Sequence, residues 1–100
     1  MPKRTSDYRS EFLSDLKEPA EAVNYLNAAL EDSEDTFLLA LRDIVEAHQV
    51  VRVAGESGLA RESLYRMLSP TGNPTYSSLK SILNAVGLSL SVRRAHSVQP

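Results

Sequence analysis

Apolar side chains recur at helical intervals through most of the chain, and the pattern is clearest in its middle. Apolar residues lie one, four, seven and eight positions after Phe37, and His48 lies eleven positions after it. This spacing places the side chains on one face of an α-helix, which predicts a core helix over residues 37–48. The face consists of Phe37, Leu38, Leu41, Ile44, Val45 and His48.

A second helix is predicted before this one. Pro19 suits the first turn of a helix, and apolar residues recur at helical spacing after it. They are Ala22, Val23, Leu26, Ala29 and Leu30. The acidic cluster EDSED, residues 31–35, interrupts the pattern and offers Asp32 or Ser33 as the N-cap of the following helix. Its negative charge also favours the positive end of that helix's dipole.

The last third of the chain begins with a loop and a helix. Two prolines, a glycine and an asparagine within SPTGNP predict a loop over residues 69–74. An apolar stripe then predicts a helix that ends at Gly87, where a left-handed C-terminal cap is expected. The stripe consists of Tyr76, Leu79, Ile82, Leu83 and Val86.

Both ends of the chain differ from this helical pattern. Residues 88–92, LSLSV, alternate as a strand buried on one face does. One strand cannot form a sheet, and the same strand of a second copy across a two-fold axis is the simplest partner. Residues 1–10 are polar without periodicity, so we expect a loose tail there. The predicted fold is all-α, with about five helices and a short C-terminal strand that pairs in a homodimer.

A lone glycine separates two short helical runs in VAGESGLARESLYRML, residues 53–68. Glycine adopts positive φ without the penalty of a Cβ atom, so Gly58 fits a sharp turn between two helices. The small Ala54, four positions earlier, lets the two backbones approach. Apolar residues at Leu59, Leu64 and Met67 complete helix-turn-helix spacing. Spacing alone also allows a helical hairpin that has no role in DNA binding.

The outward face of this pair carries the candidate DNA-binding residues. The second helix would enter the major groove, where arginine donates two hydrogen bonds to guanine, and the first would cross the phosphate backbone. The alternative is a solvated surface on which Glu62 pairs with Arg66 and Tyr65 covers the core. The candidates are Arg52 on the first helix and Arg61, Glu62, Ser63, Tyr65 and Arg66 on the second.

Composition narrows the class of protein. A chain of 100 residues forms one modest core, and its lack of cysteine excludes disulfides and thiolate chemistry. Its two histidines have no metal-ligand spacing, and no phosphate-binding glycine loop or activated nucleophile is present. We therefore expect no enzyme, no cofactor and no metal. No apolar run reaches the roughly 18 residues of a membrane span, so we expect a cytoplasmic protein without a membrane or small-molecule partner.

The net charge of −2 hides an asymmetry along the chain. Residues 1–36 carry four basic and nine acidic side chains, whereas residues 37–100 carry seven basic and four acidic. Two halves of opposite net charge favour two kinds of partner, although solvated charges that cluster by chance would give the same asymmetry. We expect an acidic N-terminal segment with one helix at residues 1–36, a DNA-binding domain with its strand at residues 37–93, and a flexible tail at residues 94–100.

Taken together, these motifs resemble a known family. Residues 58–92, GLARESLYRMLSPTGNPTYSSLKSILNAVGLSLSV, with EAVNYLNAALED and FLLALRDIVEAH before them, are similar to the small helix-turn-helix antidote proteins of bacterial addiction modules, the HigA-like antitoxins. The resemblance covers about residues 12–93, is most specific in RESLYRMLSPTGNP, and places a Cro/repressor-type domain at residues 37–86. The first helix of the pair departs from the family pattern in two ways. It opens with VVR, residues 50–52, where the family usually has a polar cap and a glutamine, and it has Gly55 where the family often has a charged residue.

The resemblance implies two roles and two partners. One is neutralisation of a cognate toxin of the RelE/HigB-like messenger-RNA ribonuclease class, and the other is repression of the operon through operator DNA. An acidic, amphipathic segment is a plausible cover for the basic surface of a ribonuclease, or else it packs on its own domain. A stand-alone transcriptional regulator and an interaction domain without DNA binding are the competing hypotheses. The candidate toxin contacts are Phe12, Leu16, Tyr25, Leu26 and Leu30.

Overall fold

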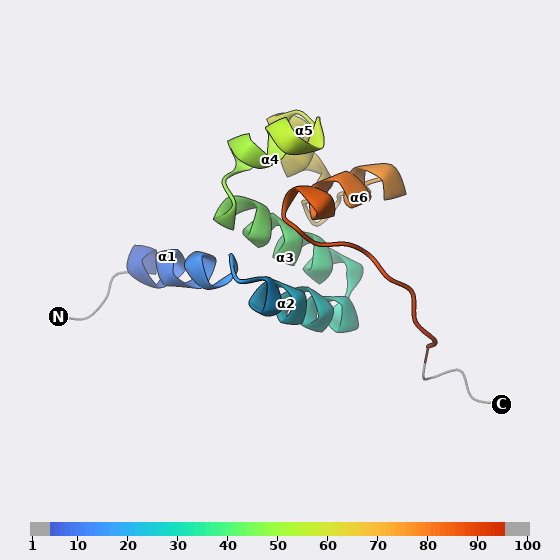
Figure 1. Cartoon of the computed structure of the whole chain (residues 1–100), viewed down its shortest axis with the longest axis horizontal. Coiled ribbons are helices and arrows are strands. Elements are labelled where there is room, and N and C mark those ends of the chain that lie inside the picture. Colours follow the sequence, from blue (N-terminus) through green and yellow to red (C-terminus); the bar gives the residue numbers. More distant parts are fainter. Residues whose placement is uncertain (1–4, 96–100) are drawn as a thin grey trace.

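The computed structural model describes residues 5–95, which form an all-helical protein. The central helix, α3, lies between two groups of helices (Figure 1). On one side, α1 and α2 pack against it, and on the other it leads into α4, which packs against α5 and α6. The helices are α1 (Thr5–Asp15), α2 (Pro19–Asp32), α3 (Glu34–Ala47), α4 (Val50–Ser57), α5 (Arg61–Met67) and α6 (Tyr76–Ala85).

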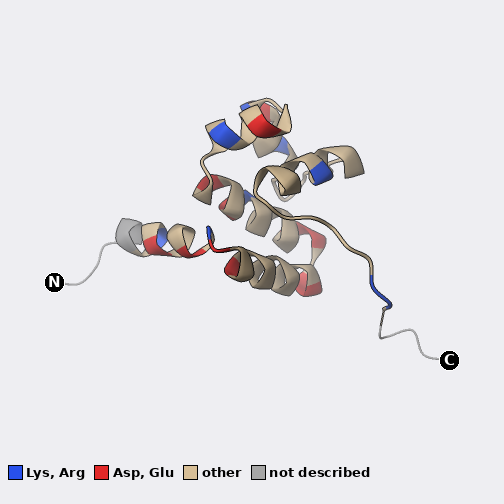
Figure 2. Cartoon of the chain, in the orientation of Figure 1, with Lys and Arg blue, Asp and Glu red and all other residues tan. Residues whose placement is uncertain are grey.

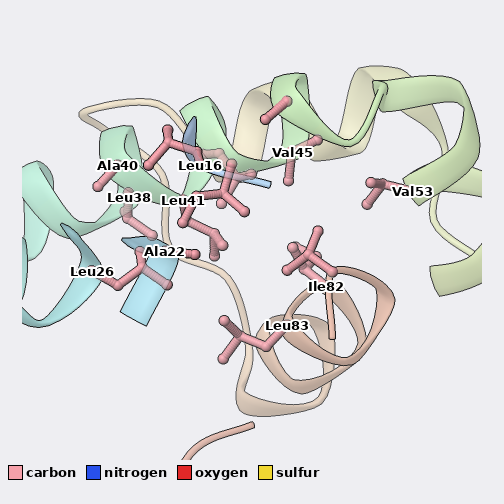
Figure 3. Close-up of a cluster of buried hydrophobic side chains, with 14 of the residues drawn as sticks. Leu16, Ala22, Leu26, Leu38, Ala40, Leu41, Val45, Val53, Ile82 and Leu83 are labelled. Carbon is pink, nitrogen blue, oxygen red and sulfur yellow. The ribbon is translucent and has the colours of Figure 1, made fainter. Parts of the chain in front are cut away.

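One hydrophobic core joins the two groups of helices. Every apolar residue of the face predicted from residue 37 is buried, and His48 ends α3 as its C-cap. Figure 3 shows side chains of α2, α3, α4 and α6 meeting in this cluster. The core therefore extends across the charge boundary near residue 36. Its largest fully buried side chains are Leu41, Ile44, Val45, Val53, Leu64, Leu68 and Ile82.

Local hydrogen bonds fix the ends of α3 and α6. The Ser33 hydroxyl accepts the Thr36 N–H at 3.0 Å, so Ser33 is the N-cap of the two candidates. The Thr75 hydroxyl accepts the Ser78 N–H at 3.1 Å in the same way at α6. Such caps each contribute about 1 kcal/mol to stability, because they satisfy N–H groups that have no helical partner.

Gly87 closes α6 as predicted. Its φ of 81° is left-handed, its N–H donates to the Asn84 carbonyl at 3.0 Å, and the Leu88 N–H donates to the Leu83 carbonyl at 2.8 Å. These two bonds form a Schellman motif, which turns the chain away from the helix axis. The C-terminal segment, residues 88–95, then leaves α6 and passes α2, with which Leu88 and Leu90 line a hollow (Figure 1).

The structure corrects the prediction of a loose N-terminal tail. Residues from Thr5 onward belong to α1, which brings the number of helices to six in the described chain. The helix has no continuous apolar stripe, and ion pairs contribute to holding it against α3. Arg9 lies 2.9 Å from carboxylate oxygens of both Asp43 and Glu46 on α3, and Phe12 packs against the core.

The predicted C-terminal strand is also absent from the described chain. Residues 88–92 have no ladder partner, because the rest of residues 5–95 is helix, turn or loop. A strand is defined by hydrogen bonds to a neighbouring strand, so an alternating sequence alone cannot form one. Residues 96–100 of the predicted flexible tail lie outside the described residues, and residues 94–95 are irregular.

Candidate functional site

Helices α4 and α5 are joined by a short turn that begins at Gly58. This glycine has a φ of 76°, and its N–H donates to the Ala54 carbonyl at 3.0 Å. A left-handed residue ends a helix and redirects the chain, which confirms the interpretation of Gly58 as the turn residue. Residues 58–60 therefore connect two helices of about two turns each.

The inner side of α5 is fixed in the core. Leu64 is 1% exposed and lies in the same cluster as Val53 of α4, which is fully buried. Leu59 and Met67 pack against this cluster from the turn and from the last turn of α5. Because both helices contribute to one core, α5 is held rigidly with its other side facing solvent.

The outer side of α5 carries the candidate basic residues. Arg61, Glu62 and Arg66 are exposed, and Ser63 and Tyr65 are half-buried. The ion pair that the sequence allows between Glu62 and Arg66 is not formed; instead the Arg66 guanidinium lies 3.4 Å from the Ser63 hydroxyl. Within residues 5–95, neither Arg61 nor Arg66 forms an ion pair with a carboxylate. Both guanidinium groups are therefore available to a ligand.

Arg52 lies on the exposed side of α4 and is already paired. Its Nε atom donates to a Glu56 carboxylate oxygen at 2.9 Å, one helical turn away. The N-cap of α4, Gln49, makes no side-chain cap bond and has a φ of 71°, which is unusual for a residue with a Cβ atom. The missing polar cap noted in the sequence thus leaves the first N–H groups of α4 without a side-chain acceptor.

Tyr65 contacts α3 rather than extending freely from α5. The guanidinium carbon of Arg42 lies 5.0 Å from the centre of the Tyr65 ring, a cation–π arrangement. Arg42 is itself 3.7 Å from a Glu46 oxygen, one turn along α3. This contact joins α5 to α3, and its long-range pairing gives no signal in the spacing of the sequence.

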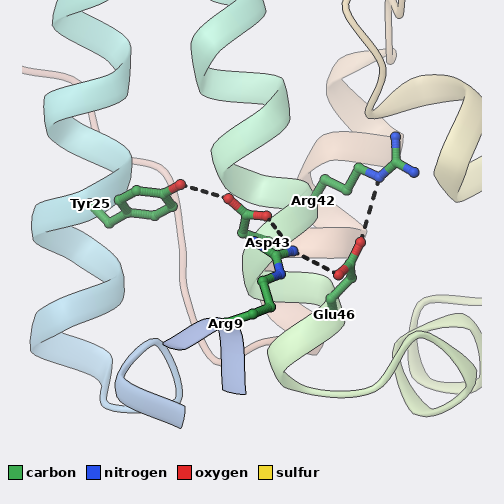
Figure 4. A network of polar contacts seen from close by, with 5 residues as sticks. All are labelled: Arg9, Tyr25, Arg42, Asp43 and Glu46. Atoms are coloured by element: carbon green, nitrogen blue, oxygen red, sulfur yellow. Dashed lines mark hydrogen bonds and ion pairs between the residues drawn. The ribbon is translucent and has the colours of Figure 1, made fainter. Parts of the chain in front are cut away.

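A polar network on α3 holds the N-terminal helices (Figure 4). The Tyr25 hydroxyl donates to an Asp43 oxygen at 2.6 Å, and Arg9 bridges Asp43 and Glu46. Partial burial and this hydrogen bond raise the pKa of Tyr25 to about 12. The Tyr25 ring also packs edge-on against Phe12, with 5.4 Å between ring centres. Both aromatic candidates for toxin contact therefore have partners within the chain.

The remaining toxin candidates divide between core and surface. Leu16 is 3% exposed and Leu26 is 6% exposed, so both side chains belong to the protein's own core. Leu30 is 53% exposed, so its side chain faces mainly solvent. The amphipathic face of α2 thus packs mainly on its own chain, which was the alternative left open by the sequence.

The charge asymmetry of the sequence is also an asymmetry in space. Figure 2 shows acidic residues at both ends of α2, and basic residues on α4, α6 and the C-terminal segment. Glu31, Glu34 and Asp35 are exposed at the corner where α2 meets α3. This acidic corner is defined by those three residues. It presents negative charge away from Arg61 and Arg66.

Across residues 5–95, no group of three or more histidine and carboxylate side chains is placed to hold a metal ion. No helix in that range is long and apolar enough to cross a membrane. His48 is half-buried, and burial, with Arg52 and Lys17 nearby, lowers its pKa.

Comparison with known proteins defines the class as an addiction module antidote. The model of the family described as "Probable addiction module antidote protein" matches residues 8–94. The chain belongs to this family. A Haemophilus influenzae (strain Rd) protein, described only as uncharacterized, is 39% identical over 81 residues, which cover 80% of this chain and 84% of that protein. No solved structure matches the chain.

Proposed function

We propose that the protein neutralises a toxin of the RelE/HigB-like ribonuclease class and represses its own operon by binding operator DNA. Family membership supports the antidote role, which requires a cognate toxin. The observation that carries the DNA-binding role is the state of α5: Arg61 and Arg66 are exposed and unpaired by carboxylates, whereas Leu64 anchors the opposite side. The cytoplasm is where such a protein meets both partners.

The proposed docking is that of a Cro/repressor-type helix-turn-helix. Helix α5, of seven residues, is narrow enough to lie in the major groove with its N-terminal residues at the base edges. Arg61 or Arg66 would donate two hydrogen bonds to guanine, and Glu62 would accept from cytosine. Arg52 on α4 would exchange Glu56 for a backbone phosphate. Tyr65 would mainly hold α5 against Arg42 and Ser63 would lie at the groove edge.

The toxin side of the proposal rests on charge. A ribonuclease that binds RNA presents a basic surface, and exposed carboxylates attract such a surface over long range. The acidic corner supplies three of them, and Leu30 lies beside it on α2. The buried Leu16 and Leu26 and the internally paired Phe12 and Tyr25 would support this surface from within.

The DNA-binding role is tested by fluorescence anisotropy with DNA from upstream of the gene and with scrambled DNA, at two salt concentrations. Arg61→Ala and Arg66→Ala are expected to weaken binding to the upstream DNA by roughly 1 to 3 kcal/mol for each bidentate base contact. Lys80→Ala is the matched control, because it removes one exposed positive charge from α6 and leaves the α4–α5 pair unchanged.

The two DNAs separate the outcomes. A loss confined to the upstream DNA supports base contacts, since scrambled DNA offers only phosphates. An equal loss on both DNAs would reduce Arg61 and Arg66 to phosphate contacts. If the unmodified protein binds both DNAs equally and weakly, with or without the toxin, the repressor role is wrong.

A further inference from the structure

A cleft with basic walls lies where the link between α1 and α2 meets the end of α3 and the side of α4. It encloses about 290 Å³. Figure 2 shows a basic position in that link, below α4 and on the side where α3 leads into it. The lining residues are Lys17, Ala47, His48, Gln49 and Arg52.

The core and local hydrogen bonds fix two walls of this cleft. Leu16, which is buried, anchors the residue before Lys17, and the Lys17 N–H donates to the Ser14 carbonyl at 3.2 Å. His48 closes α3 as its C-cap, and its N–H donates to the Ile44 carbonyl at 3.1 Å. The basic side chains therefore project from backbone that is held in place, although they come from separate elements.

The chain balances the positive charge of the cleft only in part. Arg52 is paired with Glu56, but no carboxylate within residues 5–95 lies at ion-pair distance from Lys17. Lys17 is also the sole basic side chain among residues 11–35, which carry eight acidic ones. It lines the cleft with two other basic side chains instead of pairing with those carboxylates. Because like charges repel, an anion would stabilise this arrangement.

The charges of the cleft act on the His48 ring. Burial lowers the pKa of His48 from its ordinary value of about 6.5, and the charges of Arg52 and Lys17 lower it further. Glu56 opposes them. The imidazole of the free protein is therefore neutral near pH 7, whereas a bound anion would raise its pKa and favour the charged form.

We propose that Lys17 and His48 bind a phosphate group of the DNA backbone in this cleft, beside Arg52. The oxygens of a phosphodiester carry a full negative charge and accept hydrogen bonds from ammonium, guanidinium and imidazolium groups together. DNA is the favoured source, because each strand presents a phosphate about every 3.4 Å and α4 is joined directly to α5. The proposal rests on the DNA-binding half of the proposed function and extends it, since Lys17 and His48 lie outside α4 and α5.

Binding at this site is coupled to pH through His48. Lys17 of the link and Arg52 and Glu56 of α4 are the charged groups that act on its ring. Because a bound phosphate raises the pKa of His48, DNA binding takes up a proton, and the affinity for any DNA increases as the pH falls from about 7.5 to about 6. His48→Gln keeps a neutral donor that does not titrate, so this variant should lose that part of the pH dependence.

Lys17→Gln tests the contact through the salt dependence of DNA binding. We expect it to weaken binding to upstream and scrambled DNA by the same factor, roughly three- to tenfold at low salt, and to lower the slope of log affinity against log salt by about 0.9. Lys80→Gln, at an exposed lysine of α6 outside the cleft, is the matched control and should have a smaller effect on both. Fluorescence anisotropy measures the affinities, and circular dichroism checks that both variants remain helical.

NMR titration of the full chain identifies the ligand. The ring signals of His48 are those that disappear in His48→Gln, and they report the pKa of this residue directly. The pKa is measured for the protein alone, with excess scrambled duplex DNA and with inorganic phosphate, at one ionic strength set with chloride. We expect DNA to raise the pKa of His48, and Lys17→Gln to reduce that rise.

Three results would overturn the proposal. A pKa of His48 that excess DNA leaves unchanged would show that no backbone phosphate enters the cleft. A rise with inorganic phosphate and none with DNA would make the cleft a site for the free anion. Equal effects of Lys17→Gln and Lys80→Gln would reduce the contribution of Lys17 to the overall charge. The repressor role is decided separately, because equal binding of upstream and scrambled DNA contradicts that role and leaves the phosphate site intact.

Discussion

Gly55 and Gly58 differ in backbone conformation although three positions separate them. Gly55 lies inside α4 with an ordinary helical backbone, whereas Gly58 ends the helix with a φ of 76°. At neither position would an added Cβ atom meet a heavy atom within 4 Å. The effect of a methyl group is therefore set by backbone conformation and not by packing.

The same substitution is expected to have opposite signs at these two positions. Gly55→Ala should raise the free energy of unfolding by up to about 1 kcal/mol, because alanine favours the helix. Gly58→Ala should lower it by about 1 to 2 kcal/mol, because an alanine Cβ clashes with the backbone at positive φ. Urea unfolding followed at 222 nm measures both. Equal signs would mean that α4 does not end at Gly58.

At the scale of elements, periodic spacing predicted the helices whose apolar face enters the core. Residues 37–48 and the helix after Pro19 were found in this way, as was the end of α6 at Gly87. Helix α1 was missed because Arg9 reaches carboxylates 34 and 37 residues away, and spacing carries no record of such pairs. The predicted strand is not seen in residues 5–95, because alternation alone does not supply a partner.

The candidate site was predictable to a similar extent. The turn at Gly58 and the exposure of Arg61 and Arg66 followed from local spacing. The contact between Tyr65 and Arg42 did not, because it joins separate helices. An apolar face on α2 also cannot say whether it packs on its own chain or on a partner. The apolar pattern therefore makes Leu26 a candidate toxin contact, although its side chain is buried in the protein's own core.

The junction of α2 and α3 is expected to respond to high pH through Tyr25. Burial and the hydrogen bond to Asp43 raise its pKa to about 12, so the folded protein keeps this proton after the unfolded chain has lost it. Stability from this group is complete below the ordinary tyrosine pKa of about 10 and falls as the pH rises from there to about 12.

Tyr25→Phe should remove this contribution to the pH dependence. Absorbance at 295 nm, which follows tyrosine ionisation, should then lose its component near pH 12. Tyr76→Phe is the control, because Tyr76 is an exposed tyrosine on α6. If Tyr25→Phe removes no component near pH 12, the hydrogen bond from Tyr25 to Asp43 is contradicted.

At the scale of the whole molecule, one core supports both proposed binding surfaces. Deleting residues 1–35 would remove Leu16, Ala22, Leu26 and Ala29 from that core. Large-to-small changes at single core positions already cost about 2 to 5 kcal/mol, so this truncation would unfold the protein. Toxin binding is therefore better tested with surface substitutions than with truncation.

Neutralising the acidic corner should slow association with the toxin. Glu31→Gln combined with Glu34→Gln is expected to lower the association rate roughly tenfold at low salt, with a smaller effect at high salt, because exposed charges steer encounter. The same change at Glu56 and Glu62, on α4 and α5, is the matched control. Stopped-flow mixing with the protein encoded by the neighbouring gene measures the rates. An equal effect of both pairs would contradict a localised toxin surface.

The burial of Leu64 from α5 in the same cluster as Leu26 from α2 also bears on the lifetime of the protein. A small domain with a single core unfolds as one cooperative unit. A protease that captures the unfolded chain therefore destroys both proposed surfaces in one event, at a rate governed by the population of open molecules. Repression and neutralisation would then decay together in the cell and share one half-life.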